Sequence, residues 1–138
     1  MQASKRGLDV GIVTRDVEAS LHFYVDVLGL ELVEQLTIPW GTMHRLRFGD
    51  SWLKIVDPSA VPEGADAAPG IDAATGIRYV TFEIDDVDDV WARAVAAGAP
   101  TYHDLGPFGT KGVVMGMVLD PDGNVVELLH RPASAAVV

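Results

Sequence analysis

The sequence contains no cysteine among its 138 residues, which excludes disulfide bonds, thiolate metal sites and a cysteine nucleophile. Basic residues are also scarce, because ten Lys and Arg stand against twenty Asp and Glu, a formal net charge of −10 at pH 7. Nucleic acids and anionic membrane surfaces are bound through clustered Lys and Arg. We therefore expect neither a nucleic acid nor a membrane as a partner.

Long apolar runs are absent too, and no stretch approaches the roughly 18 residues of a membrane span. The start, Met1–Gly7, carries two cations but no apolar segment follows them, so we expect no signal peptide and a cytoplasmic location. The overall composition, with 49% hydrophobic and 22% charged residues, is typical of a globular protein. A chain of this length buries roughly two-thirds of its unfolded surface, which suffices for one domain.

A strand, a helix and a stop signal follow one another near the start of the chain. Val10 and Ile12 alternate as the buried residues of a strand do. Asp16 is typical of a helix N-cap, because its carboxylate can accept from the free amides of the first turn. Gly29 stands where a left-handed residue ends a helix. Apolar residues at helical spacing connect the two, namely Val17, Leu21, Tyr24 and Leu28, with Phe23 and Val27 beside them.

The same order returns 70 residues later. Asp86 takes the place of Asp16, and Gly98 ends the second helix one residue sooner than Gly29 ends the first. Three more strands are expected after each helix, at 31–38, 42–48 and 52–56, and at 101–105, 112–119 and 125–130. Each half is therefore predicted to be β-α-β-β-β, as modules 7–57 and 77–132 joined by a Pro-, Ala- and Gly-rich linker at 58–76.

These halves predict an α+β fold of two tandem modules that form a cupped mixed sheet with the helices outside. A four-stranded sheet with one helix leaves its second face bare, so we expect the two halves to combine into a single domain. The open faces are then predicted to line a shared concave surface.

Five stretches carry a resemblance to a known family. They are Val10-Gly-Ile-Val-Thr-Arg-Asp16, Ser20-Leu-His-Phe-Tyr24, Val27-Leu-Gly-Leu30, Val80-Thr-Phe-Glu-Ile-Asp-Asp-Val87 and Leu119-Asp-Pro-Asp-Gly-Asn-Val-Val-Glu-Leu128. Together they resemble the vicinal-oxygen-chelate superfamily, which includes glyoxalase I, extradiol dioxygenases, methylmalonyl-CoA epimerase and bleomycin-resistance proteins. The resemblance covers about Lys5 to Pro132 and implies the fold described above and a homodimer.

Members of this family often hold a divalent metal ion with four inward side chains, mostly His, Gln or Glu. The positions that match here hold Asp9, Lys54, Tyr79 and Glu127, and only Glu127 agrees with the family. A lysine ammonium has no lone pair for a metal ion, but it can supply the positive charge that the metal would supply. We therefore expect no metal ion and no other cofactor. A shifted ligand set of Asp9, His44 and Glu127 stays an alternative.

Strand alternation assigns further side chains to the predicted cup. Apolar walls suit a small organic ligand, and polar groups among them suit its orientation. The expected substrate-binding residues are Trp52, Thr81, Glu83, Met115, Met117 and Leu129, with Trp40 and Tyr102 at the rim.

These residues predict a metal-independent enzyme that does acid–base chemistry, as an isomerase, epimerase or lyase, on a small carbonyl compound. Glu127 or Asp9 is expected to be the base and Tyr79 a hydrogen-bond donor, while Lys54 stabilises an oxyanion and contacts Asp9 or Glu127 directly. The alternative is a small-molecule or antibiotic-binding protein without catalysis, similar to bleomycin-resistance proteins. In a purely structural interpretation, the same charges only hold the fold together.

The remaining expectations concern residues outside this set. His22 and His130 are expected to face solvent, and Tyr102 is expected to point inward in preference to His103. The glycine-rich segment 105–112 is expected to form a mobile lip, and the tail 133–138 to fray.

Overall fold

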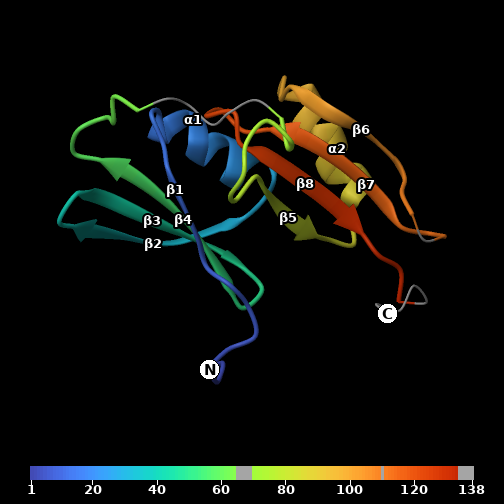
Figure 1. The fold of residues 1–138 in the computed structure, drawn as a ribbon, viewed down its shortest axis with the longest axis horizontal. Coiled ribbons are helices and arrows are strands. Elements are labelled where there is room, and N and C mark those ends of the chain that lie inside the picture. Colours follow the sequence, from blue (N-terminus) through green and yellow to red (C-terminus); the bar gives the residue numbers. More distant parts are fainter. Residues whose placement is uncertain (65–69, 110, 134–138) are drawn as a thin grey trace. The chain divides into compact units, whose positions relative to one another are not determined.

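The computed structural model describes residues 1–64, 70–109 and 111–133 of the chain, which divides into two compact units, Met1–Gly64 and Ala65–Val138 (Figure 1). We call them unit 1 and unit 2. Residues 65–69 of the predicted linker, residue 110 of the predicted lip and residues 134–138 of the predicted tail lie outside the described residues. Within the described ranges, no helix is long and apolar enough to cross a membrane.

Unit 1 is a four-stranded mixed sheet in the order β1-β4-β3-β2. The edge strand β1 runs parallel to β4, and the other pairs are antiparallel. Its strands are β1 (Val10–Val13), β2 (Glu31–Ile38), β3 (Gly41–Phe48) and β4 (Ser51–Pro58).

The helical segment of unit 1 is confirmed at its start and its end but is not a uniform α-helix. Asp16 caps α1 (Val17–Leu21), since its Oδ1 accepts from the backbone N–H of Ala19 at 3.0 Å. The chain then continues as the π-helix η1 (His22–Val27). Gly29 adopts a left-handed φ of 91°, as the stop signal predicts.

Alternation along β3 and β4 gives the sheet of unit 1 one buried and one polar face. Leu46 lies opposite Leu53 and His44 lies opposite Ile55 across the two strands, and all four side chains are buried. α1 packs against β4. The residues between them, Arg45 and Lys54 among others, belong to the other face.

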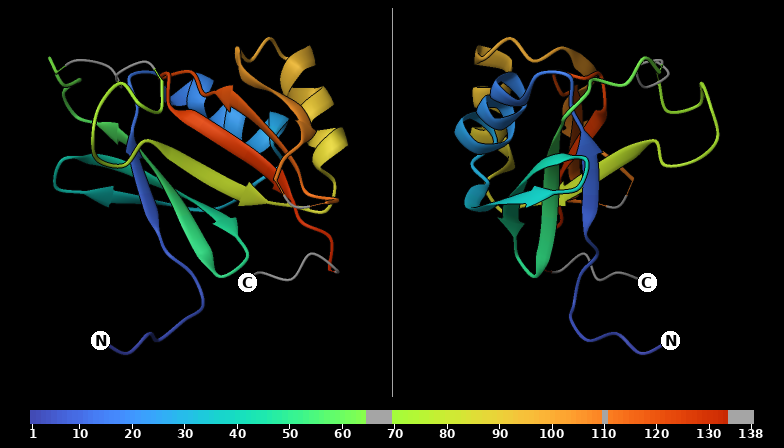
Figure 2. Two further views of the ribbon diagram at one scale, coloured as in Figure 1. Left: turned by 45° about the vertical axis from the view of Figure 1, so that its right-hand side comes forward. Right: turned by 90° about the vertical axis from the view of Figure 1, so that its left-hand side faces the viewer.

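Unit 2 repeats this topology in the strand order β5-β8-β7-β6, again with its edge strand β5 parallel to its neighbour β8 (Figures 1 and 2). The α+β class and the β-α-β-β-β order predicted from the sequence are confirmed. The elements of unit 2 are β5 (Tyr79–Glu83), α2 (Val87–Ala96), β6 (Thr101–Pro107), β7 (Val114–Leu119) and β8 (Val125–His130).

Helix α2 packs on the sheet of unit 2 through Trp91. A Cβ added to Gly116 of β7 would come within 2.6 Å of the Trp91 ring, so the absence of a side chain there lets the indole approach the strand. Asp86 precedes α2 as predicted, but the prediction that it repeats the role of Asp16 is wrong, because its carboxylate makes no capping hydrogen bond. Gly98 ends the helix with a φ of 82°.

The turn between β7 and β8 is built around the carboxylate of Asp120, which is buried. Its Oδ1 accepts from the backbone N–H of Asp122 at 3.0 Å and from that of Asn124 at 2.8 Å. The Nδ2 of Asn124 donates to Oδ2 at 2.9 Å. These bonds fix the start of β8, the strand that carries Glu127.

Candidate functional site

The polar face of unit 1 places Asp9 and Lys54 side by side, as the sequence predicts. Asp9 precedes β1, and its Oδ2 lies 3.7 Å from the Lys54 Nζ of the neighbouring strand β4. Its Oδ1 accepts from the backbone N–H of Trp52 at 2.9 Å and also from the Lys5 ammonium. One carboxylate therefore holds two cations and one backbone amide.

These contacts hold the pKa of Asp9 below its ordinary value of 3.8. The hydrogen bond from Lys5 is the largest cause, followed by the bond from the Trp52 amide, and the charge of Lys54 adds to both. Burial acts in the opposite direction but does not reverse the shift. Asp9 is thus stabilised as an anion by its neighbours, and its lowered pKa makes it poorly suited to accept a proton from a substrate.

Two arginines on β3 share this face, and sequence reasoning missed both of them. The Arg45 guanidinium carbon lies 4.0 Å from the centroid of the Trp52 ring, and that of Arg47 lies 5.2 Å from it. Arg45 also forms an ion pair with Glu34 of β2, and the Arg47 Nε lies 3.8 Å from Glu31 Oε2. The ring of Trp52, predicted to contact a ligand, is therefore in contact with two guanidinium groups.

The alternation of β3 is the signal that could have found these arginines. His44, Leu46 and Phe48 form one set along the strand and Arg45 and Arg47 the other. The sequence leaves open which set shares the face of Lys54. Register decides the question, because Arg45 lies directly opposite Lys54.

His44 lies on the buried face of unit 1, away from Asp9. It pairs with Ile55 across β3 and β4, it is 7% exposed, and its Nδ1 is buried with no hydrogen-bond partner among the described residues. Asp9 contacts Lys54, which belongs to the opposite face. The alternative metal site built from Asp9, His44 and Glu127 is therefore wrong, because two of its ligands lie on opposite faces of one sheet.

In unit 2, Glu127 of β8 has a fixed orientation. Thr81 lies opposite it on β5, and the Thr81 hydroxyl donates to Glu127 Oε1 at 2.9 Å. Thr81, which we predicted as a ligand contact, thus positions Glu127. Glu83 lies two residues further along β5, with its Oε1 3.7 Å from the Nε of Arg131. Tyr79, at the start of the same strand, is exposed.

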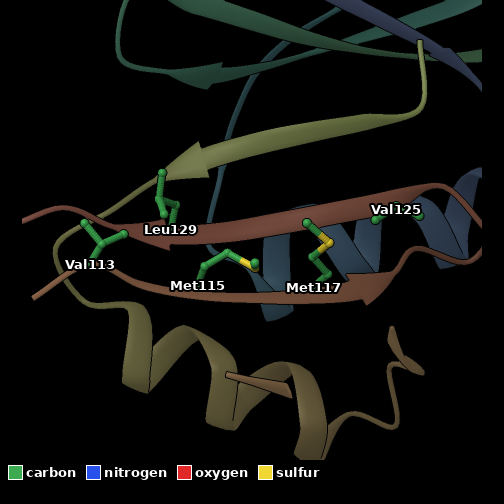
Figure 3. Close-up of a cluster of buried hydrophobic side chains, with 5 residues drawn as sticks. All are labelled: Val113, Met115, Met117, Val125 and Leu129. Atoms are coloured by element: carbon green, nitrogen blue, oxygen red, sulfur yellow. The ribbon is translucent and has the colours of Figure 1, made fainter. Parts of the chain in front are cut away.

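The predicted apolar residues of unit 2 form a methionine cluster with two valines (Figure 3). Met115 and Met117 lie beside Leu129 and Val125 on the neighbouring strand, and Val113 extends the group. All five side chains are buried, and Ile71 packs against them together with Leu119. That this cluster forms the apolar wall of a ligand site stays a prediction. The cluster consists of Val113, Met115, Met117, Val125 and Leu129.

Tyr102 anchors the segment that carries Ile71. Its Oη accepts from the backbone N–H of Ile71 at 3.0 Å, while Arg78 donates to the carbonyl oxygen of Gly70 at 2.6 Å. His103 lies opposite Met117 across β6 and β7. Because the ladder shifts between Thr101 and His103, simple alternation does not assign faces here.

The remaining sequence expectations have mixed outcomes. His22 is exposed as predicted and pairs with Asp26 at 2.9 Å. The prediction that His130 faces solvent is wrong, because its side chain is half-buried. Its Nδ1 lies 3.1 Å from the carbonyl oxygen of Ile84, which can act only as a hydrogen-bond acceptor. Trp40 lies in the turn between β2 and β3 and is 63% exposed. The first residues of the predicted lip, up to Pro107, belong to strand β6.

The donor set fits the metal ion implied by the resemblance poorly. Of the four matching positions, Lys54 has no lone pair to offer while charged, and Asp9 already neutralises two ammonium groups. Tyr79 would have to lose its proton first. Across residues 1–64, 70–109 and 111–133, no three His, Asp or Glu side chains are grouped as a metal site requires.

Comparison with known proteins places this geometry in a family. The model of the glyoxalase/bleomycin resistance protein/dioxygenase superfamily matches residues 8–128. A lactoylglutathione lyase of Arabidopsis thaliana is 27% identical over 130 residues, covering 93% of this chain and 45% of the relative, so the chain spans about half of that protein. A probable lactoylglutathione lyase of Synechocystis is 26% identical and covers 83% of this chain and 87% of the relative.

Solved structures agree with this assignment. A glyoxalase family protein from Enterococcus faecalis superposes with a TM-score of 0.69 at 27% identity, over 91% of this chain and 98% of that protein. The antibiotic-binding protein TnmS3 from a Streptomyces species has a TM-score of 0.67 at 23% identity, over 95% of this chain and all of that protein. At that identity the second likeness shows the fold alone.

Proposed function

The chain belongs to the glyoxalase/bleomycin resistance protein/dioxygenase superfamily, and from that premise we propose that it is an enzyme that does acid–base chemistry on a small carbonyl compound without a metal ion. The observation that carries the proposal is the pair of Lys54 and Asp9, whose charged atoms lie 3.7 Å apart. A fixed cation at a position where the family resemblance implies a metal ligand can stabilise negative charge in the metal's place.

Glu127 is the proposed base. Thr81 holds one of its oxygens at 2.9 Å, which leaves the other oxygen for a substrate. Its carboxylate takes a proton from the carbon next to the carbonyl group, and the electrons of the broken C–H bond form an enolate. We assign the stabilisation of this negative charge to the Lys54 ammonium. The Glu127 carboxylic acid then returns the proton to a different position of the enolate.

Asp9 and Tyr79 have supporting roles in this proposal. Asp9, predicted as an alternative base, instead helps to position the Lys54 ammonium, which lies 3.7 Å from its Oδ2, while its Oδ1 accepts from Lys5 and the Trp52 amide. The exposed Tyr79 hydroxyl is the proposed hydrogen-bond donor to the substrate.

Exchange of carbon-bound hydrogen with deuterated water tests the proposal directly. Proton NMR would follow the exchange next to the carbonyl group of 2-oxo acids, 2-hydroxy ketones and lactoylglutathione, which appears in the names of the relatives. Glu127→Gln should slow the exchange at least about 100-fold, because it removes the base. Lys54→Met should slow it by a similar factor. The control is Glu63→Gln, an exposed carboxylate of unit 1 with no proposed role.

Chelation tests metal independence separately. We expect exchange to survive treatment with EDTA, and elemental analysis to find far less than one transition-metal ion per chain. Loss of exchange on chelation, with recovery on adding zinc, nickel or manganese, would overturn this part of the proposal. Glu127→Gln would then be expected to prevent metal binding.

A binding protein without catalysis is the second candidate. The observation in its favour is the methionine cluster. Apart from Val113, which precedes β7, its apolar side chains lie on β7 and β8, and Glu127 is the only carboxylate on these two strands. In that case Glu127→Gln and Lys54→Met leave ligand binding intact, and no carbonyl compound in the panel exchanges hydrogen.

A further inference from the structure

Four side chains form a block on the polar face of unit 1. Arg45 and Arg47 lie on β3, and across the ladder they stand directly opposite Lys54 and Trp52 of β4. Since side chains two residues apart share a face, all four project to the same side of the sheet. We call these four residues the cation block.

Trp52 is the aromatic support of this block. Its ring centroid lies 4.0 Å from the Arg45 guanidinium carbon and 5.2 Å from that of Arg47, both within the range of cation–π attraction. One indole therefore keeps two guanidinium groups near each other, against their mutual repulsion.

The cations of the block retain unused hydrogen-bonding capacity. Lys54 lies 3.7 Å from Asp9 and Arg47 lies 3.8 Å from Glu31, both beyond hydrogen-bond length. In the described part of the chain, neither side chain donates a hydrogen bond. The Arg45 Nε is buried without a partner there, although another nitrogen of that guanidinium pairs with Glu34.

The carboxylates of Glu34, Glu31 and Asp9 offset part of the charge of this block, and the free donors of its cations can still bind a further anion. Like charges directly opposite on neighbouring strands destabilise a sheet, and Arg45 and Lys54 are such a pair. Three cations with idle donors on one face are, in contrast, well suited to an oxyanion, which accepts several charge-assisted hydrogen bonds at once.

We propose that the cation block is an anion-binding subsite that holds the carboxylate or phosphate group of a small organic substrate. The inference names the substrate class of the site proposed above and so rests on the proposed function. Arg45 and Arg47 bind the anionic group, and Lys54, directly opposite Arg45, adds a third positive charge beside it.

Matched pairs of carbonyl compounds test this subsite. Pyruvate is compared with neutral methyl pyruvate, and dihydroxyacetone phosphate with dihydroxyacetone, so that the two arms distinguish a carboxylate from a phosphate. Ligand-observed NMR measures the dissociation constants. We expect at least one anion to bind more tightly than its neutral partner. Equal affinities in both pairs overturn the proposal.

Arg47→Gln is the main variant, because Arg47 is half exposed and its loss leaves the other ion pairs intact. It should raise the dissociation constant of the preferred anion about tenfold, the loss of roughly one charge-assisted bond, and leave the neutral partner unchanged. Lys111→Gln, the loss of an exposed cation in unit 2, is the matched control. An unchanged anion affinity in Arg47→Gln contradicts the subsite.

Glu31→Gln should change the anion affinity in the opposite direction. It removes the carboxylate that faces Arg47, so anion affinity should rise. A gain in affinity cannot come from a variant that has merely unfolded. Failure of the proposed function is a different result: anions bind and depend on Arg47, but Glu127→Gln leaves hydrogen exchange intact. Failure of the subsite alone is exchange that depends on Glu127 with no preference for anions.

Discussion

Asp9 is the residue on which the charges of the polar face depend. It accepts from Lys5 and from the Trp52 amide, and it lies beside Lys54. Without its negative charge, two ammonium groups would repel each other next to Arg45. The lowered pKa of Asp9 is the direct expression of this stabilisation, because the charged form is the one that the neighbours bind.

We predict that Asp9 contributes stability at neutral pH that is lost in acid. Its pKa is lowered in the folded state, so the contribution is fully present above the ordinary value of 3.8 and disappears as the pH falls through the folded-state pKa below it. Asp9→Asn should therefore be less stable than the wild type at pH 7, and the difference should shrink as the pH falls below 3.8. Urea denaturation at pH 7 and at a series of pH values below 3.8 measures the effect.

Two lysine variants provide the control for the cause of this shift. Because the hydrogen bond from Lys5 is the largest contribution and the charge of Lys54 a smaller one, Lys5→Met should raise the pKa of Asp9 more than Lys54→Met does. Carboxyl-carbon NMR titration reports the pKa in each variant. The reverse order would show that the bond from Lys5 is not formed in solution.

At the scale of elements, the two helical segments differ in length by one residue, and the structure accommodates the extra residue in a π-helical turn. The first helical segment has one more residue between its cap and its glycine than the second. The Leu28 N–H donates to the carbonyl of Phe23, five residues back, in a π-helical bond. A single extra residue inside a helix with fixed ends is accommodated in this way, and such turns often lie at functional sites.

The contact between helix α2 and its sheet yields a prediction about Gly116. A Cβ there would lie 2.6 Å from Trp91 Cζ3 and 3.0 Å from the Cα of Leu105, so both a ring and a backbone would have to move. Gly116→Ala should lower the free energy of unfolding by about 1–3 kcal/mol, as overpacking does. Thermal and urea denaturation measure the loss.

Gly106 of β6 is the matched control for this substitution. Among the described residues, no atom lies within 4 Å of a Cβ added there. Gly106→Ala should change stability by less than about 0.5 kcal/mol. Equal effects of the two substitutions would mean that the helix does not pack against β7 through Trp91.

The sequence predicted the elements well because its signals are local. Asp16, Gly29 and Gly98 act through the backbone next to them, and alternation alone assigns the faces of β4 and β8. The sequence did not predict which side chains become neighbours across paired strands. The neighbours of Arg45 and Trp52 follow from the register of the three strands β2, β3 and β4. A bulge next to Val33 enters that register, and no pattern in the chain announces it. The orientation of Glu127 by Thr81 depends on register in the same way.

At the scale of the whole molecule, the negative charge is unevenly distributed between the units. Residues 1–64 hold six basic and nine acidic side chains, a net charge of −3, whereas residues 65–138 hold four and eleven, a net charge of −7. The unit that contains the cation block is therefore the less acidic one. An anion approaching the molecule still meets a total charge of −10, which opposes it at long range.

We predict that anion affinity passes through a maximum as salt is added. At about 0.01 M salt the Debye length is about 30 Å, so the whole charge of −10 repels the anion, while at about 0.15 M it is about 8 Å and the cation block dominates. Near 1 M the length is about 3 Å, and the block itself is screened. Titration of pyruvate or dihydroxyacetone phosphate, whichever binds more tightly, over this range of salt measures the curve. The neutral partner is the control, and its affinity should not change with salt.

Arg47→Gln should lower the maximum anion affinity and leave the rise at low salt in place, because that rise comes from the charge of the molecule as a whole. A steady fall in affinity from the lowest salt upward would show that the local charges of the block outweigh the total charge at every distance.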